Sequence, residues 1–166
     1  MNTLDAVSLI KKTVGNPEGG LPEDIFLMIS SMTPLVNVDL LVKDEKKRTL
    51  LSWRDDIHSG TGWHVPGGII RYRERFEDRI LKVAQSELKI ESIKFNPDFI
   101  DVQQMIHRER EERCHFISFL YECRVSSLDV IVDRSNEHYP GCLVWHDSCP
   151  DDLIKYHSVY ADFINN

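Results

Sequence analysis

Residues 62–90 read GWHVPGGIIRYRERFEDRILKVAQSELKI: a short apolar strand, a Pro-Gly-Gly turn and a charged amphipathic segment. On a helical wheel of about 100° per residue, Glu87 falls in the same stripe as Phe76 and Ile80. A carboxylate in an apolar stripe needs a cation, a hydrogen-bond network or a helix end that lets it reach water. The stretch therefore predicts a helix over 74–88 after a tight turn, a layout that suits a phosphate or metal site. Fraying of the helix near Glu87 is the alternative that the residues alone leave open.

The segments on either side of this helix predict a mixed α and β domain. Four runs are rich in β-branched and aromatic residues, which is typical of strands: 33–42, 48–53, 98–106 and 114–125. Helical spacing of apolar residues occurs at 4–14 and 23–31, and again after Pro150, where a proline and two acids suit a first turn. The order indicates one α/β (α+β) domain over 33–166, a mixed β-sheet sandwiched between helices, preceded by an N-terminal helical arm over 1–32.

Composition and charge restrict the class of protein. A chain of 166 residues with 42% hydrophobic content can bury one substantial core. A net charge of -7 and a pI near 5.5 argue against a nucleic-acid partner, which needs a basic face. The four cysteines lack the spacing of a disulfide scaffold, and the sequence has neither a long apolar run nor a basic-then-apolar leader. We expect a cytoplasmic protein with reduced thiols and no membrane partner.

Several residues of the opening stretch match a known motif. The matching positions are Gly68, Glu74, Glu87 and Ile90. The stretch resembles the Nudix box: glycine, five residues, glutamate, seven residues, then arginine-glutamate-apolar-x-glutamate-glutamate-x-glycine-apolar. The middle departs from that pattern, with Lys82 at the arginine, Val83 and Ser86 at two glutamates, and Lys89 at the late glycine. These departures remove carboxylates with which family members hold several divalent ions around a diphosphate.

One branch of the family, the GDP-mannose mannosyl hydrolases, lacks the same carboxylates, and the resemblance to it extends beyond the box. Thr33-Pro34-Leu35-Val36 with Asp39, then Trp53-Arg54, then Trp63 to Gly68 follow that branch's order, so the resemblance covers about 33–146. It implies a Nudix-like fold and hydrolysis of GDP-mannose or a related GDP-sugar. Attack at the anomeric carbon would release GDP and a hexose. The resemblance also implies a homodimer and one Mg²⁺ ion, with Mn²⁺ as an alternative.

The resemblance assigns three metal ligands and a general base. The backbone carbonyl of Gly67 and the side chains of Glu87 and Glu137 would hold the metal ion. His138 would deprotonate the attacking water, since a histidine accepts a proton near neutral pH. A solvated turn is the alternative interpretation of 136–140.

Two arginines and an aspartate complete the expected site. Arg54 and Asp39 would bind the substrate. The branch commonly has an arginine directly after the two glycines, where this chain has Ile69. Arg71 is the candidate that takes over its catalytic role of stabilising charge on the leaving diphosphate.

The remaining histidines are interpreted as structural. The run HREREERCH at 107–115 predicts a solvated, charged hairpin between two strands. Its arginines, Arg108, Arg110 and Arg113, are alternative phosphate contacts. Cys142, His146 and Cys149 lack the fourth ligand of a structural zinc site. His64 is interpreted as a packing or loop-orienting residue of the strand that leads to the turn.

Two functions of different classes are compatible with these residues. The first is a magnesium-dependent nucleotide-sugar hydrolase, for which the retention of Glu87 argues. The second is a degenerate Nudix domain that binds a nucleotide sugar without turnover or acts as an interaction module, for which the changed box positions and the arm argue. A pyrophosphatase that attacks phosphorus is a third hypothesis.

Overall fold

The computed structural model describes residues 2–57, 60–133, 135 and 138–166. The helices, in chain order, are α1 (Thr3–Val14), η1 (Pro17–Gly19), α2 (Glu23–Ser30), α3 (Phe76–Val83), η2 (Ala84–Leu88), η3 (Lys155–Tyr160) and α4 (Ala161–Asn165). The strands are β1 (Leu35–Lys43), β2 (Thr49–Asp56), β3 (Gly60–His64), β4 (Gly67–Ile69), β5 (Lys94–Phe95), β6 (Asp101–Ile106), β7 (His115–Arg124) and β8 (Leu143–His146).

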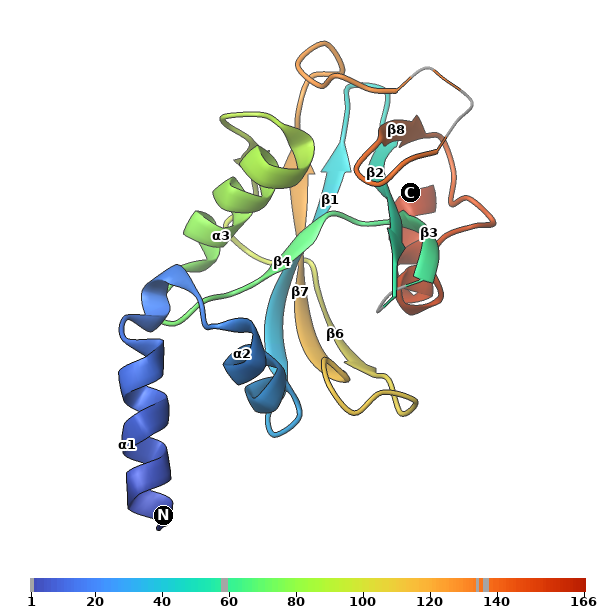
Figure 1. Cartoon of the computed structure of the whole chain (residues 1–166). Helices are drawn as coiled ribbons and strands as arrows, with labels where there is room; N and C mark the ends of the chain where they lie inside the picture. The colour runs from blue at the N-terminus through green and yellow to red at the C-terminus, as the bar shows by residue number, and fades with distance from the viewer. Residues whose placement is uncertain (1, 58–59, 134, 136–137) are drawn as a thin grey trace.

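The strands of the described residues form one mixed sheet around a long parallel pair, β1 and β7 (Figure 1). The main path runs β3-β2-β1-β7-β5, while β4, β6 and β8 pair with β1, β7 and β2. All pairs other than β1 with β7 are antiparallel. The prediction of an α+β domain with a mixed sheet between helices is confirmed.

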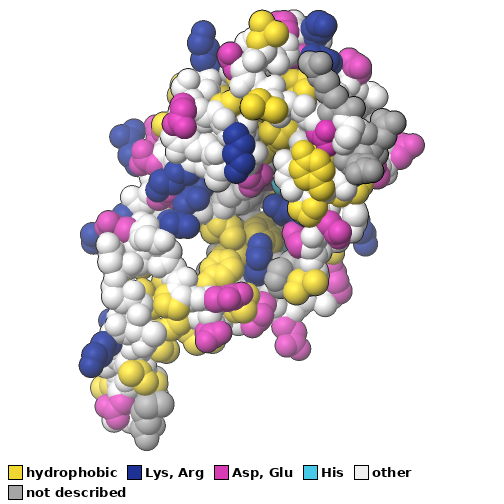
Figure 2. All heavy atoms as spheres, turned by 45° about the horizontal axis from the view of Figure 1, so that its top comes forward, with side chains coloured by type: hydrophobic (Ala, Val, Ile, Leu, Met, Phe, Trp, Pro, Cys, Tyr) yellow, Lys and Arg dark blue, Asp and Glu magenta, His cyan; other side chains and the backbone are white. Residues whose placement is uncertain are grey.

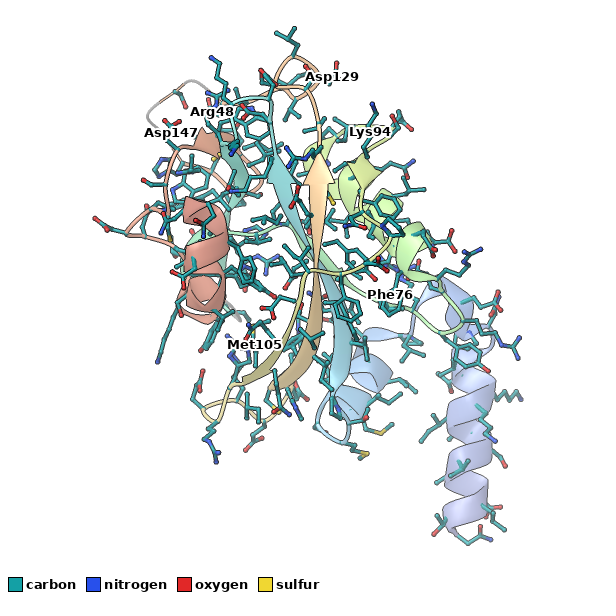
Figure 3. All side chains as sticks on the ribbon, turned by 180° about the vertical axis from the view of Figure 1, so that it is seen from behind. Arg48, Phe76, Lys94, Met105, Asp129 and Asp147 are labelled. Carbon is teal, nitrogen blue, oxygen red and sulfur yellow. The ribbon has the colours of Figure 1, made fainter. Side chains whose placement is uncertain are left out.

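Helical segments cover both faces of this sheet, because successive side chains of a strand point to opposite faces. Leu40 packs with Ile80 of α3 in one buried cluster, and Leu41 packs with Tyr160 of η3 in the other. Figure 3 shows the two layers from behind, with Phe76 at the start of α3 on one side and Met105 of β6 on the other. The sheet therefore lies between two packed layers.

The central helix forms where the sequence predicts it, with two differences. It begins at Phe76, two residues later than expected, and its last turn, η2, is π-helical, with the Lys89 amide bonded to the Ala84 carbonyl. Lys89 then adopts the left-handed conformation, with φ 60° and ψ 33°. This is the position of the late glycine in the Nudix box, so the backbone keeps the turn that a glycine favours.

The prediction of a helix directly after Pro150 is wrong in its start. Asp151 and Asp152 lie in a turn, and the 3₁₀ helix η3 begins only at Lys155. The amide of Trp63 donates to the Asp152 carbonyl, and the amide of Ile154 donates to the Trp63 carbonyl. These bonds hold the segment against β3 and use the backbone groups that a helix would need.

The N-terminal 32 residues contain the helices α1, η1 and α2. A capping box between Asn2 and Asp5 starts α1, and no side chain of this helix is buried. It projects from the rest of the molecule (Figure 1). Figure 2 shows this protrusion with a hollow between it and the body, and hydrophobic side chains gathered beside it. None of the described helices is long and apolar enough to cross a membrane.

Candidate functional site

Two adjoining cavities lie where the turn after β3 meets the sheet. The central cavity, about 180 Å³, is lined by three arginines and three histidines: Arg54, Arg110, Arg113, His64, His107 and His157. The Glu87 cavity, about 330 Å³, is lined among others by Trp53, Ser86 and Glu87. Arg54 and His64 line both cavities. Cationic and imidazole groups on one side of a carboxylate suit a phosphate-bearing ligand with an associated cation.

Gly67 lies on the wall of the central cavity, paired with Asp39 in the β1–β4 ladder. A Cβ at Gly67 would lie 2.1 Å from Asp39 Oδ1 and 2.8 Å from the Val38 carbonyl. Glycine is therefore required because the turn crosses β1 too closely for any side chain. The structure thus places Gly67, whose carbonyl is predicted to bind the metal, directly beside Asp39, which is predicted to bind the substrate.

Asp39 is buried and accepts three hydrogen bonds. Asn37 Nδ2 donates to Oδ1 at 2.6 Å, while the hydroxyls of Ser118 and Tyr160 donate to Oδ2 at 2.5 and 2.6 Å. Burial raises the pKa of Asp39 to about 6, against the lowering effect of the two hydroxyl bonds. The nearby charge of Glu87 raises this pKa further. The geometry makes Asp39 a support for the Gly67 turn and the C-terminal segment as well as a lining residue.

Glu87 points from η2 toward the end of β3. Its Oε2 lies 3.4 Å from Nε2 of His64, and its side chain is 25% exposed. Among the described residues, neither of these two atoms has a hydrogen-bond partner. The helix therefore does not release Glu87 to water by fraying, and the carboxylate is left with an unused acceptor beside a buried imidazole.

The other box positions are built into the fold. Glu74 accepts bonds from the Arg71 amide, from Arg79 and from Lys82, the last at 2.7 Å. Lys82 thus pairs with the box glutamate from the position where the pattern has arginine. Val83 is 2% exposed, and its Cγ2 would lie 2.9 Å from a Cβ at Gly68. The apolar side chain of Val83 packs the helix against the turn, and Glu87 of the next turn lines the Glu87 cavity.

The interpretation of 107–115 as a solvated hairpin is wrong for His107. That side chain is 3% exposed, and its ring lies 3.7 Å, centroid to centroid, from the ring of Tyr156. Burial lowers the pKa of His107 to about 4, and Arg110 lowers it further. The guanidinium of Arg110 also lies over the Tyr156 ring, 4.7 Å from its centre. The hairpin thus delivers Arg110 and Arg113 into the central cavity, as its alternative interpretation allowed.

The loop assigned to the general base is placed only in part. His138 is exposed, and its ring stacks on Trp53 at 4.3 Å and meets Trp63 at 4.9 Å. Trp53 and Trp63 pack with the cluster that contains Tyr160, whereas α3 and η2 pack on the other face of the sheet, so these two ring contacts do not bring His138 to Glu87. Glu137, the predicted third metal ligand, lies outside the described residues. The role of His138 as base stays a prediction.

Arg71 is not brought together with the other predicted residues. Its Nη1 donates to the Gly19 carbonyl at 2.5 Å. It lines a third, largely apolar cavity of about 740 Å³ between the N-terminal helices and the turn, which we call the arm cavity. Arg54 is in the expected place and forms an ion pair with Asp56 at 3.4 Å. The catalytic role of Arg71 stays a prediction, and the structure gives it a contact with the arm instead.

His157 is a cavity residue that sequence reasoning missed. Its Nδ1 accepts a hydrogen bond from the Val65 amide at 2.9 Å, which places the proton of the neutral ring on Nε2. Burial, and then His64 and Arg54, hold the pKa of His157 well below its usual range. The available signal was its position, four residues after Leu153 and three before Tyr160, in the apolar stripe expected of this segment.

The side chains fit a weakly caged divalent ion. In the part of the chain that the structure describes, no three His, Cys, Asp or Glu side chains come together as a metal site. Oε2 of Glu87 and Nε2 of His64, both without a hydrogen-bond partner among the described residues, are nevertheless chemically suited to bind a cation. A site with so few protein ligands leaves room for substrate phosphates and water, which is usual for Mg²⁺.

Known proteins resemble the chain in part of its sequence and in its fold. No protein-family model matches the chain. The low-salt glycan biosynthesis protein Agl8 of Haloferax volcanii is 33% identical over 75 residues, which are 45% of this chain and 47% of that protein. The chain thus spans about half the length of the curated relative it matches.

Solved structures match over a larger part of the chain. A MutT protein from Methanosarcina mazei Go1 superposes with a TM-score of 0.61 at 20% identity, covering 80% of this chain and 94% of that one. The Nudix domain of Shewanella oneidensis NrtR, complexed with ADP ribose, superposes with a TM-score of 0.54 at 14% identity, covering 99% and 95%. At such identities the likeness concerns the fold. The chain has the Nudix fold, as the motif in residues 62–90 predicted.

Proposed function

We propose that the protein is a divalent-metal-dependent hydrolase of nucleoside-diphosphate sugars that attacks the anomeric carbon and releases the intact nucleoside diphosphate. The proposal rests on the residues that stand at the glutamate positions of the Nudix box. Val83 is buried against Gly68 and Ser86 has no charge, so Glu87 alone of these three positions offers a carboxylate to the cavities. One carboxylate suits one ion on a diphosphate leaving group, whereas attack at phosphorus in this family uses several ions.

The arginines of the central cavity would bind the diphosphate. Arg54, Arg110 and Arg113 converge on its walls, and planar guanidinium groups match pairs of phosphate oxygens. A divalent ion held by Glu87 and the Gly67 carbonyl would neutralise the same phosphates. Together these groups would lower the basicity of the leaving diphosphate, which is what cleavage of its bond to the sugar requires.

His138 is the proposed base. A water oxygen would attack the anomeric carbon while its proton passes to the imidazole, and the carbon–oxygen bond to the β-phosphate would break with its electron pair leaving on the diphosphate. Attack opposite the leaving group inverts the anomeric configuration. The tilted ring of Trp53 and the edge-on ring of Trp63 would hold the imidazole of His138 in place.

Two relatives support the substrate class. The NrtR domain is complexed with ADP ribose, a diphosphate between two sugars, and Agl8 is a glycan biosynthesis protein. The resemblance to the GDP-mannose mannosyl hydrolases makes GDP-sugars the first substrates to test, beginning with GDP-mannose. The homodimer and the cytoplasmic location implied by that resemblance belong to the same proposal, and light scattering of the purified protein tests the dimer.

The test is hydrolysis of a panel of nucleotide sugars with Mg²⁺ or Mn²⁺ in water enriched in oxygen-18. We expect nucleoside diphosphate on ion-exchange chromatography and the heavy oxygen in the hexose. Glu91→Gln is the matched control for Glu87→Gln, because Glu91 is an exposed carboxylate four residues away. Label in a phosphate, or release of a nucleoside monophosphate, would show a pyrophosphatase and overturn the proposal.

A binding module is the second candidate, and one observation favours it. The histidine assigned as base is stacked on tryptophan, with both aromatic contacts made, so its ring is already engaged as a packing partner. A binder would give a dissociation constant by calorimetry for a nucleotide sugar and no product after prolonged incubation with either metal. Turnover in the panel excludes this second candidate.

A further inference from the structure

His64 is buried at the end of β3 in a way that packing does not explain. It is 4% exposed, and neither ring nitrogen finds a hydrogen-bond partner among the residues that the structure describes. A buried polar group left without a partner costs about 1–3 kcal/mol, and an apolar side chain of similar size would avoid this cost. The position therefore has a histidine for a reason that the protein's own contacts do not supply.

Oε2 of Glu87 lies within ion-pair distance of His64 Nε2, and the two atoms do not form a hydrogen bond. The distance from His64 Nε2 to this oxygen is 3.4 Å, and neither atom has a hydrogen-bond partner within the described ranges. Two side chains bound to one cation through bonds of about 2.1 Å have their ligand atoms about 3.0–3.4 Å apart. The separation is thus that of two neighbouring ligands on one ion.

The surroundings are compatible with a cation between these atoms. Arg54 lines the same cavity and forms an ion pair with Asp56, while the Asp39 carboxylate adds negative charge nearby. The ring of His157 lies 6.0 Å from that of His64, and its Nδ1 is occupied by the Val65 amide. His64 and Glu87 are therefore the pair of side chains with unused ligand atoms at this point of the site.

We propose that His64 is a metal ligand through Nε2, beside Glu87, and that the site therefore binds a first-row divalent transition metal in preference to Mg²⁺. This inference rests on the proposed function insofar as it concerns the same metal site. Imidazole nitrogen binds transition metals well, whereas Mg²⁺ takes oxygen ligands and retains its water. The nitrogen ligand changes which ion the site selects, and the carboxylate supplies the charge.

The test is pulsed electron paramagnetic resonance of the chelator-stripped full chain loaded with Mn²⁺ in the absence of substrate. Nitrogen bonded to Mn²⁺ modulates the spin echo, so we expect a nitrogen-14 modulation that changes to a nitrogen-15 pattern in protein grown with ring-labelled histidine. His64→Gln removes the modulation. His115→Gln retains it, because His115 is a histidine of the β6–β7 hairpin, bonded to Gln104 at 3.0 Å.

Calorimetry supplies the selectivity. We expect Co²⁺ to bind the parent at least about tenfold more tightly than Mg²⁺, and His64→Gln to lose about tenfold or more of its Co²⁺ affinity with a smaller change for Mg²⁺. A fold check by circular dichroism accompanies the variant, and His64→Asn replaces it if it does not fold. Absence of nitrogen modulation in the Mn²⁺-loaded parent overturns the proposal. Because no substrate is present, this result is independent of whether the protein hydrolyses nucleotide sugars.

Discussion

Replacing Asp39 by asparagine should change how the stability of the protein depends on pH. The carboxylate is fully buried between three donors, and burial raises its pKa from 3.8 to about 6. The asparagine side chain has nearly the same shape and could accept from Asn37 through its carbonyl. Its amide would donate to the Ser118 and Tyr160 hydroxyls, which can accept as well as donate. The variant keeps the fold and removes the titration.

The sign and size of the effect depend on the two protonation states. A folded-state pKa above the unfolded value means that the native state holds the proton more tightly, so the contribution is complete below about pH 3.8 and is lost as pH rises through about 6. A difference of roughly two pKa units is worth about 3 kcal/mol in total. Between pH 4.5 and 7.5 the parent should lose about 2 kcal/mol of unfolding free energy relative to Asp39→Asn.

The assay is urea denaturation of both proteins at pH 4.5, 5.5, 6.5 and 7.5, in chelator so that no metal ion contributes. The difference between the two free energies of unfolding isolates Asp39, because all other titrating groups are common to both chains. Tyr160→Phe is the informative companion. It removes a donor at 2.6 Å from the carboxylate, so it should cost more at pH 7.5, where the carboxylate is charged, than at pH 4.5.

Two outcomes would refute this reasoning. A difference that stays constant across the four pH values means that Asp39 titrates as it does in the unfolded chain. A parent that gains stability relative to Asp39→Asn as pH rises means that the three donors outweigh burial, and that the native state prefers the carboxylate.

Three further predictions concern the turn, the helix and the arm. Glu87→Gln should abolish metal-dependent turnover and leave the thermal midpoint nearly unchanged, measured beside Glu91→Gln; turnover near that of the parent would remove Glu87 from the site. Lys89→Gly should raise the free energy of unfolding by about 0.5–1 kcal/mol. The left-handed conformation costs a non-glycine residue about 1–2 kcal/mol, and the greater freedom of glycine in the unfolded chain cancels part of the gain. Urea denaturation measures the change, and a loss of stability would contradict the argument. Arg71→Ala should increase amide hydrogen exchange over 17–30 by releasing the Gly19 carbonyl, whereas a lower kcat with unchanged exchange would return Arg71 to the catalytic role that the sequence suggests.

The sequence was sufficient for the fold because the strongest patterns are local. The runs rich in β-branched and aromatic residues at 33–42 and 114–125 contain β1 and β7, the parallel pair at the centre of the sheet. The two adjacent glycines identified the turn, and a glutamate within an apolar stripe identified the helix. Together these two elements form the candidate site. Boundaries were less accurate where tertiary contacts decide them, as at Asp151 and Asp152, whose backbone bonds go to β3.

Four of the predicted site residues lie beside the cavities, and their roles stay predictions. Gly67, Asp39 and Arg54 line the central cavity, and Arg54 and Glu87 line the Glu87 cavity. The burial of His107 was not found, because it depends on a contact between a hairpin and the C-terminal segment, which are distant from each other in the chain. No periodicity encodes such a contact. Strand alternation predicted that Arg71 would lie on the same side as Ile69. This position was wrong, because the chain leaves the sheet after β4 and Arg71 turns toward the arm.

The π-helical turn η2 acts as a one-residue insertion in the helix that carries Glu87. Each α-helical residue advances the side-chain direction by about 100°, so deletion of one residue within Ala84–Leu88 would rotate the later side chains of the turn by about that angle. A neighbour of Glu87 would then face β3, while the strands kept their places. In evolutionary terms, a single-codon insertion or deletion suffices to bring a carboxylate into the site or to take it out, with no substitution at all. Within this fold, the residue that faces the site can therefore differ by one position from the residue that the spacing of the motif predicts.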